Sequence, residues 1–195
     1  MGSTKPRGPY RKSDERRTEI LQAALEAYAT SDAGGPTLKA IGDKVGLTES
    51  ALLYHFGSRE ELFWAIVKAR DESDRFQVDD EEVTATDFTR LGQMIAHNAS
   101  TPGLVKLFLE QAVAAVSPSH PAHDELRARY ERFNAVLAQG LSGLKGLPPD
   151  QAAWLARIVI AASDGLQIQW LLDPSIDMRA DLDALIALAT EALGE

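Results

Sequence analysis

The sequence predicts an all-α protein of nine helices, with a small N-terminal head and a longer helical body. Apolar residues recur every three to four positions along most of the 195 residues, which is the helical period. Sustained alternating runs of β-branched residues, the signal of strands, are missing. The 14 glycines and 9 prolines divide the periodic segments instead of forming low-complexity tracts. The length suits one domain or two small ones.

The first predicted helix covers residues 14–31. Its apolar residues share one stripe: Ile20, Leu21, Ala24, Leu25 and Tyr28. Ser13 stands before it as a capping residue, and two carboxylates follow in the first turn, where the helix dipole favours anions. We therefore expect this helix to begin at residue 14.

Two short helices come next, joined by a glycine turn. Thr37 can cap a helix that ends at Val45, and Gly46 suits the left-handed residue that ends a helix. Thr48 can cap the following helix, residues 49–55. This pattern is typical of a helix-turn-helix, whose second helix enters the major groove of DNA.

The remaining segments predict one bridging helix and five long ones. Ser58 and Glu61 form a capping box that opens the bridging helix. The acidic tract 71–82 predicts a solvated helix end and linker. The five long helices are expected at residues 86–100, 102–116, 121–143, 149–172 and 178–193. We divide the chain into a head, residues 1–57, and a body, residues 58–195.

The charge of the chain differs between its two parts. The total is −9, but residues 1–70 carry 11 basic and 9 acidic side chains, a net +2, whereas residues 71–195 carry 9 and 20, a net −11. Fields near a surface depend on local charge, so the acidic total does not exclude DNA binding. The basic arm, residues 5–12, either tracks an adjacent DNA groove or is a solvated tail.

The second short helix of the motif carries side chains suited to DNA. Ser50 can reach a base edge or a phosphate, although small polar residues at helix starts are also often simply solvated. Thr48 offers a hydroxyl beside free N–H groups. Tyr54 and His55 are hydrogen-bond donors for the phosphate backbone, or else packing residues.

A resemblance to a known family rests on spaced positions in residues 17–63. These positions are Arg17, Ile20-Leu21, Ala23-Ala24, Tyr28, Thr37-Leu38, Ile41, Val45-Gly46-Leu47-Thr48, Ala51-Leu52, Tyr54-His55-Phe56, Ser58-Arg59 and Glu61-Leu62. The stretch resembles the head of the tetracycline-repressor (TetR) family of bacterial transcriptional regulators. It departs mildly from the family pattern at Tyr28, Gly42, Thr48 and Arg59, where Phe, Ala, Ser and Lys are common.

The resemblance implies a double-stranded DNA operator, a variable helical body that binds a small-molecule effector, and a homodimer formed through the last two helices. Effector binding in the family moves the two heads apart and releases DNA. Carried onto this sequence, the expected DNA contacts are Thr37, Lys39, Thr48, Glu49, Ser50, Ala51, Tyr54, His55 and Arg59. The chain is therefore expected to be a repressor that reads a palindrome. An activator fits the sequence equally well.

The body contains polar groups scattered among apolar ones, as an effector pocket requires. The candidate ligand contacts are Met94, His97, Asn98, Phe108, Gln111, Tyr130, Asn134, Trp154 and Gln167. Each of these could instead be a core or surface residue. Asp164 and Gln167 interrupt an apolar helix, so pocket, dimer seam and internal hydrogen bond all stay open.

Two apolar stripes predict the dimer interface. They are Ala152, Leu155, Val159, Ala162, Leu166 and Trp170 on one helix, and Leu182, Leu185, Ile186, Leu188 and Ala189 on the next. Two such helices from each subunit would form a four-helix seam.

Several classes of function find no support in the sequence. The absence of cysteine excludes disulfides, thiolate nucleophiles and zinc-cysteine sites. No catalytic motif, phosphate loop or cofactor fingerprint occurs, and His120 with His123 is better explained by a helix start than by a metal. No segment can span a membrane and no signal peptide is apparent, so we expect a cytoplasmic regulator. The alternatives are a helical small-molecule-binding protein or enzyme, and a head that binds protein.

Overall fold

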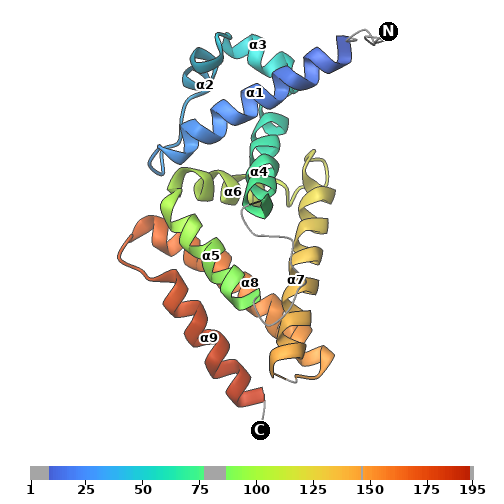
Figure 1. Ribbon diagram of the computed structural model, residues 1–195, viewed down its shortest axis with the longest axis vertical. Helices are drawn as coiled ribbons and strands as arrows, with labels where there is room; N and C mark the ends of the chain where they lie inside the picture. Colours follow the sequence, from blue (N-terminus) through green and yellow to red (C-terminus); the bar gives the residue numbers. More distant parts are fainter. Residues whose placement is uncertain (1–8, 77–86, 146, 194–195) are drawn as a thin grey trace, which may run out of the picture.

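Every regular element in the described part of the chain is a helix (Figure 1). The computed structural model describes residues 9–76, 87–145 and 147–193. The helices are α1 (Pro9–Ala29), α2 (Leu38–Val45), α3 (Glu49–Tyr54), α4 (Arg59–Phe76), α5 (Asp87–Ser100), α6 (Pro102–Ala114), α7 (His123–Lys145), α8 (Pro149–Leu172) and α9 (Met178–Leu193). The prediction of nine helices and no strands is confirmed over these residues.

The short helices of the head begin and end as their capping residues predict. The Thr37 hydroxyl accepts a hydrogen bond from the Ala40 N–H at 3.1 Å, and the Thr48 hydroxyl accepts one from the Ala51 N–H at 3.2 Å. Gly46 ends α2 with φ of 68°, the left-handed conformation that favours glycine. Three local signals therefore fix the turn of the motif.

One predicted helix start is wrong. α1 begins at Pro9 and not after Ser13, because proline is well tolerated in a first helical turn and the helix extends back to it. The acidic tract begins as a helix end, as predicted, because α4 continues to Phe76. The prediction that the tract is solvated is wrong at Asp71, which is half-buried against Arg129. The rest of the tract, residues 77–82, lies outside the described residues, as does the arm before Pro9.

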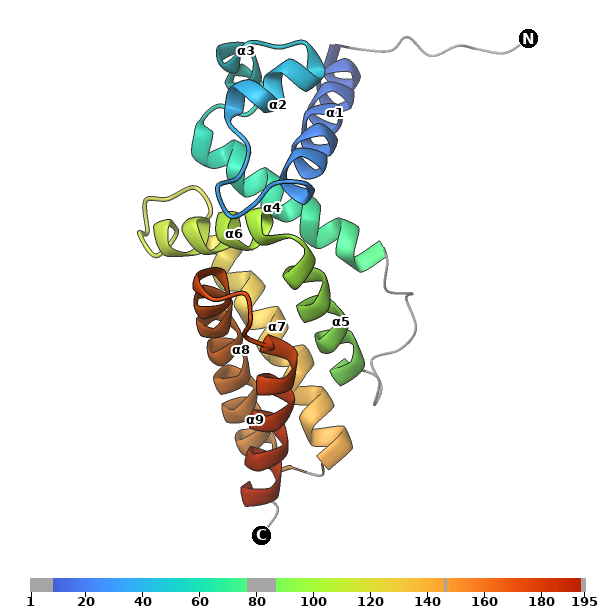
Figure 2. The same cartoon turned by 90° about the vertical axis from the view of Figure 1, so that its left-hand side faces the viewer.

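The head and the upper body share one apolar core. In Figure 2, α1, α2 and α3 form one end of the molecule, α4 leads away from them, and α6 crosses beside α4. Fully or nearly fully buried side chains from all these helices form a single cluster, including Ile20, Ile41, Leu52, Leu62, Ile66, Leu107 and Phe108. A second cluster joins α5, α6, α7, α8 and α9 around Val105, Leu141, Leu155, Val159 and Leu182. The core thus continues through α4 from the head into the body.

Gly103 sets the distance between the head and α6. A Cβ atom at this position would lie 2.3 Å from the Ser31 Oγ and 3.0 Å from the Asp32 carbonyl oxygen. Since such distances are shorter than real contacts allow, only glycine lets the start of α6 pack this closely on the segment after α1. None of the helices in the described residues is long and apolar enough to cross a membrane.

Candidate nucleic-acid interface

The start of α3 presents an exposed polar face at the end of the head. Thr48, Glu49 and Ser50 are exposed, and the Thr48 and Ser50 hydroxyl oxygens lie 3.2 Å apart. On the opposite side, Leu52 and Phe56 are buried in the shared core. Ala51 is half-buried between the two faces. The helix is therefore held by one side and open on the other, as a groove-reading helix must be.

Among the described side chains of the head, Tyr54 is the most exposed aromatic. It is 86% exposed, and its ring meets the neighbouring His55 edge-on at 6.0 Å between centroids. His55 itself is half-buried. A large exposed ring with a hydroxyl tip supplies both apolar contact and a hydrogen bond to a partner. The structure brings these two donors together at the end of α3.

α2 adds a cation beside α3. Lys39 Nζ lies 2.7 Å from the Asp43 carboxylate, and both side chains are exposed, as is Thr37. The pKa of Lys39 is raised by this hydrogen bond first, then by the charges of Asp43 and Glu49.

Two arginines of α1 fix the motif from within. Arg16 donates a hydrogen bond to the Val45 carbonyl oxygen at 2.6 Å, where α2 ends. Arg17 donates to the His55 carbonyl oxygen, where α3 ends, and its guanidinium lies 4.3 Å from the centre of the Phe56 ring. Cations at these carbonyls complement the negative end of each helix dipole. Sequence reasoning counted both arginines as surface charge and missed this role.

Arg59, at the start of α4, completes the predicted DNA-contact set. It is exposed, and its guanidinium lies 5.0 Å from the centre of the Phe63 ring. Ser58 caps the helix by accepting a hydrogen bond from the Glu61 N–H at 3.0 Å. Stacking on Phe63 limits the conformations of this cation without removing its hydrogen-bond donors.

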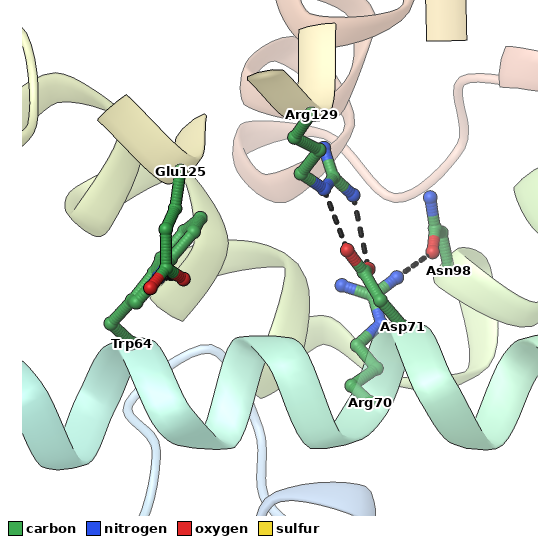
Figure 3. Close-up of polar contacts among 6 residues, drawn as sticks. All are labelled: Trp64, Arg70, Asp71, Asn98, Glu125 and Arg129. Carbon is green, nitrogen blue, oxygen red and sulfur yellow. Dashed lines mark hydrogen bonds and ion pairs between the residues drawn. The ribbon is translucent and has the colours of Figure 1, made fainter. Parts of the chain in front are cut away.

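α4 is connected to the body by polar side chains that the sequence analysis did not identify (Figure 3). The Trp64 indole N–H donates to Glu125 Oε2 at 2.6 Å, and Lys68 pairs with the same carboxylate at 3.0 Å. Burial alone would raise the pKa of Glu125, but the hydrogen bonds from Trp64 and Lys68 and the Lys68 charge outweigh it and lower that pKa. These contacts join α4 to the first turn of α7.

A second set of contacts lies two turns further along α4 (Figure 3). Arg129 of α7 donates to both oxygens of Asp71, at 2.7 and 3.1 Å. Its guanidinium also lies 4.5 and 4.7 Å from the ring centres of Phe108 and Phe133. The neighbouring Arg70 donates to the buried Asn98 of α5. The element that carries the head is thus paired with both α5 and α7.

The predicted ligand contacts are only partly brought together. Tyr130 donates a hydrogen bond to Asp164 of α8 at 2.7 Å, and the Asn134 amide donates to the Tyr130 carbonyl oxygen at 2.8 Å. The Asn134 and Gln111 side-chain oxygens are buried without a hydrogen-bond partner. Phe108 is buried in the shared core near these helices.

The other predicted ligand contacts are placed differently. Met94 and His97 are half-buried on α5, Gln167 is buried on α8, and Asn98 is occupied by Arg70. Trp154 lies apart, 46% exposed on α8. Two hollows that the structure shows, one between α4 and α7 and a smaller one beside Gly103, are lined by none of the nine residues.

Burial perturbs the Tyr130–Asp164 pair. The pKa of Asp164 is raised because burial outweighs the hydrogen bond from Tyr130 and the Arg129 charge. The pKa of Tyr130 is raised by burial first and then by the Asp164 charge. The half-buried Asp164 carboxyl thus joins α7 and α8 through its hydrogen bond with Tyr130.

His120 and His123 are held by the backbone. His120 Nδ1 accepts a hydrogen bond from the Ala122 N–H at 3.2 Å, and His123 Nδ1 lies 2.8 Å from the Ala115 carbonyl oxygen. Both imidazoles thus take part in the turn that leads into α7. Among the described residues, no group of three or more acidic, histidine or cysteine side chains is arranged to hold a metal.

The expected dimer stripe on α8 and α9 is mostly wrong. Ala152, Leu155, Val159, Trp170, Leu182 and Ile186 are buried inside the subunit, because α8 uses that face to pack on α7 and α9. The exposed apolar side chains are instead Trp154, Ile158, Ile168 and Leu172 on α8 and Leu188 on α9. Of the predicted residues, only Leu188 is among these.

A capped recognition helix, exposed on one side and braced by the first helix, defines a helix-turn-helix DNA-binding protein of the all-α class. Residues 20–66 match the profile of the bacterial regulatory proteins of the tetR family. The head of the chain therefore resembles the DNA-binding head of this family of bacterial regulators.

Curated relatives extend the similarity beyond the head. The chain is 26% identical over 172 residues to the nucleoid occlusion factor SlmA of Marinomonas sp., which covers 79% of this chain and 82% of the relative. It is 27% identical over 117 residues to the HTH-type transcriptional repressor AcnR of Corynebacterium diphtheriae, covering 60% and 47% of the two chains.

Solved structures share the whole fold. A transcriptional regulator from Rhodococcus sp. Rha1 aligns with a TM-score of 0.64 at 16% identity, covering 92% of this chain and 98% of the other. NalD, the secondary repressor of the MexAB-OprM multidrug efflux pump in Pseudomonas aeruginosa, aligns with a TM-score of 0.55 at 19% identity, covering 93% and 97%. These similarities show the fold alone.

Proposed function

We propose that the chain is a dimeric repressor that binds a palindromic operator and is released from it by a small-molecule effector. The observation that carries this proposal is the exposed face of α3, with Tyr54 uncovered, on a motif that Arg16 and Arg17 hold rigid. Repression is supported by the similarity to AcnR and NalD, which are both repressors. The expected DNA contacts remain the nine residues of the motif named above.

The exposed face of α8 supports the dimer. Trp154, Ile158, Ala161, Gly165, Ile168 and Leu172 follow one another in alternating steps of four and three residues, the spacing of a helix-packing seam. A Cβ atom at Gly165 would meet nothing within 4 Å, so this glycine leaves room at the middle of the seam. Two subunits joined there would each place one α3 helix at one half-site of the operator. The centres of the two half-sites would lie about 34 Å apart, or a multiple of this.

A shared core supports release by a ligand. α4 packs in one cluster with the head and with α6, and its side chains pair with α5 and α7. An effector bound near Tyr130 and Asp164 would need to favour one head spacing by only about 1–3 kcal/mol to change operator occupancy 5- to 150-fold.

The first experiment is selection of operator DNA from a random pool at two salt concentrations. An enriched palindrome supports the proposal, and affinity should fall steeply as salt rises because phosphate contacts release counterions. Arg59→Gln should weaken operator binding about tenfold and reduce the salt slope by about one. The matched control is Arg127→Gln, an exposed arginine of α7 that should leave binding unchanged. Failure to enrich any DNA, or equal losses in both variants, contradicts the proposal.

The dimer is tested separately by a charge on the seam. Ile168→Glu should give monomers in analytical ultracentrifugation and lose the palindrome, because a carboxylate would be buried at the interface. Gln169→Glu places the same charge on the adjacent exposed position and should remain dimeric. Dimers of unchanged stability in the Ile168 variant would show that α8 is not the seam.

A further inference from the structure

A surface cleft lies between α4 and α7, away from the predicted ligand contacts. Its volume is about 160 Å³, similar to a cavity that accommodates benzene. Its lining residues are Trp64, Lys68 and Asp71 from α4, and Glu125, Ala128, Arg129 and Arg132 from α7. Four of these residues are drawn in Figure 3, where Trp64 and Glu125 meet at one end and Asp71 and Arg129 at the other.

The carboxylates of the cleft are already occupied. Both oxygens of Asp71 accept hydrogen bonds from Arg129, and Glu125 accepts from the Trp64 indole and pairs with Lys68. Acceptors in this cleft are therefore satisfied from within the protein. A cationic ligand would have to break one of these pairs to bind.

The cations of the cleft still have donors to offer. Arg132 is exposed and makes no hydrogen bond or ion pair with any described residue. Lys68 pairs only with Glu125 among the described residues and is 47% exposed at its side chain. With three cations against two carboxylates, the lining carries a net +1 on a body whose residues 71–195 total −11. Counted over the described residues, the donors of the cleft that lack an acceptor are those an anion would use.

An apolar wall accompanies these donors. The Trp64 ring and the Ala128 methyl group line the same cleft, and the aliphatic stems of the arginines add to it. A ligand of about benzene size with one anionic group would match both the wall and the free donors. Inorganic anions would use only the donors.

We propose that the cleft between α4 and α7 binds a small carboxylate with an aromatic or short aliphatic body. The carboxylate lies on Arg132 and Lys68, and the apolar body lies against Trp64 and Ala128. This site goes beyond the proposed function, because it depends on ligand binding alone and not on DNA release. Its success or failure is therefore separable from that of the repressor proposal.

The test is calorimetric titration of the full chain with benzoate, with benzamide as its uncharged counterpart and inorganic phosphate as an anion without an apolar body. Benzoate should bind with one site per chain and at least about tenfold more tightly than either. Benzamide lacks the charge, and charge-assisted hydrogen bonds exceed neutral ones. Phosphate has no apolar body to bury against Trp64 and Ala128. Arg132→Gln should weaken benzoate at least about tenfold. Arg127→Gln, on the same helix, should leave its affinity unchanged.

A second variant keeps every charge of the cleft. Ala128→Met should fill the cavity and abolish benzoate binding while circular dichroism and the melting temperature report an intact fold. The proposal is overturned if benzoate does not bind at millimolar concentration, or if benzamide or phosphate binds as tightly. It is also overturned if the Arg127 and Arg132 variants lose the same affinity, or if the filled cleft still binds.

Discussion

The ion pair between Asp71 and Arg129 should be one of the strongest polar contributions to the stability of the α4–α7 contact. Its side chains are only 20% and 14% exposed, and the pair is bidentate. Removing one partner of a fully buried pair costs about 3–5 kcal/mol, whereas exposed pairs contribute about 0–1 kcal/mol. Asp71→Asn leaves the Arg129 charge between two aromatic rings, which partly stabilise it. We therefore expect a loss of about 2–3 kcal/mol in the free energy of unfolding.

For a chain of this length such a loss lowers the melting temperature by about 5 to 10 °C. The measurement is thermal and urea unfolding at fixed protein concentration, since a dimer makes stability concentration-dependent. Glu131→Gln is the matched control: it breaks the exposed Arg127–Glu131 pair of the same helix, at 3.7 Å, and should change stability by less than about 0.5 kcal/mol. If the two variants melt at the same temperature, the Asp71 pair has no more effect than a surface contact and the reasoning fails.

Three further predictions concern the half-buried Asp164 carboxyl and two glycines. A raised pKa means that the folded chain holds the Asp164 proton more tightly than the unfolded chain does. Protonated Asp164 therefore contributes most to stability below the pKa that this carboxyl has in the unfolded chain. The contribution is lost as pH rises through the pKa that it has in the folded chain. Asp164→Asn keeps an acceptor for Tyr130, and its unfolding free energy should change less between pH 4 and 7 than that of the unaltered chain. Gly103→Ala should destabilise the fold by about 1–3 kcal/mol in urea unfolding, because the added methyl group overpacks the contact. Gly143→Ala is the control: its methyl group meets nothing within 4 Å, so the change should be neutral or stabilising by up to about 1 kcal/mol. Gly46→Ala should cost about 1–2 kcal/mol from its left-handed φ of 68°, and an unchanged urea midpoint would refute it.

The features that the sequence predicts correctly are local ones. Thr37, Thr48 and Gly46 act on backbone groups within a few residues, so their chemistry alone places the helix ends of the motif. The exposed and buried faces of α3 follow in the same way from helical spacing. The DNA-contact assignments stay predictions.

The face that α8 buries could not be predicted, because the helix is apolar on more than one side. Leu155 and Val159 are fully buried, while Trp154 and Ile158, one position before each, are exposed. Each pair has the spacing of an apolar stripe on a helix. Only packing against α7 and α9 decides which of the two stripes is buried. Contacts between distant residues were missed for a similar reason. Asp71 and Arg129 are 58 residues apart, and nothing in the acidic tract indicates a partner for its first carboxylate.

The use of arginines inside the molecule changes the meaning of the charge count. Arg16 and Arg17 hold helix ends of the head, and Arg129 pairs with Asp71 in the α4–α7 contact. These cations contribute less to an external field than the count of basic residues implies, since carbonyl oxygens, a carboxylate or aromatic rings already face them. Under the proposed function, DNA affinity then depends on the few exposed donors of the motif and on the basic arm. Because α1 holds both short helices, α3 would not move alone. A change in the distance between the two heads of a dimer would have to move each head together with α4 as one body.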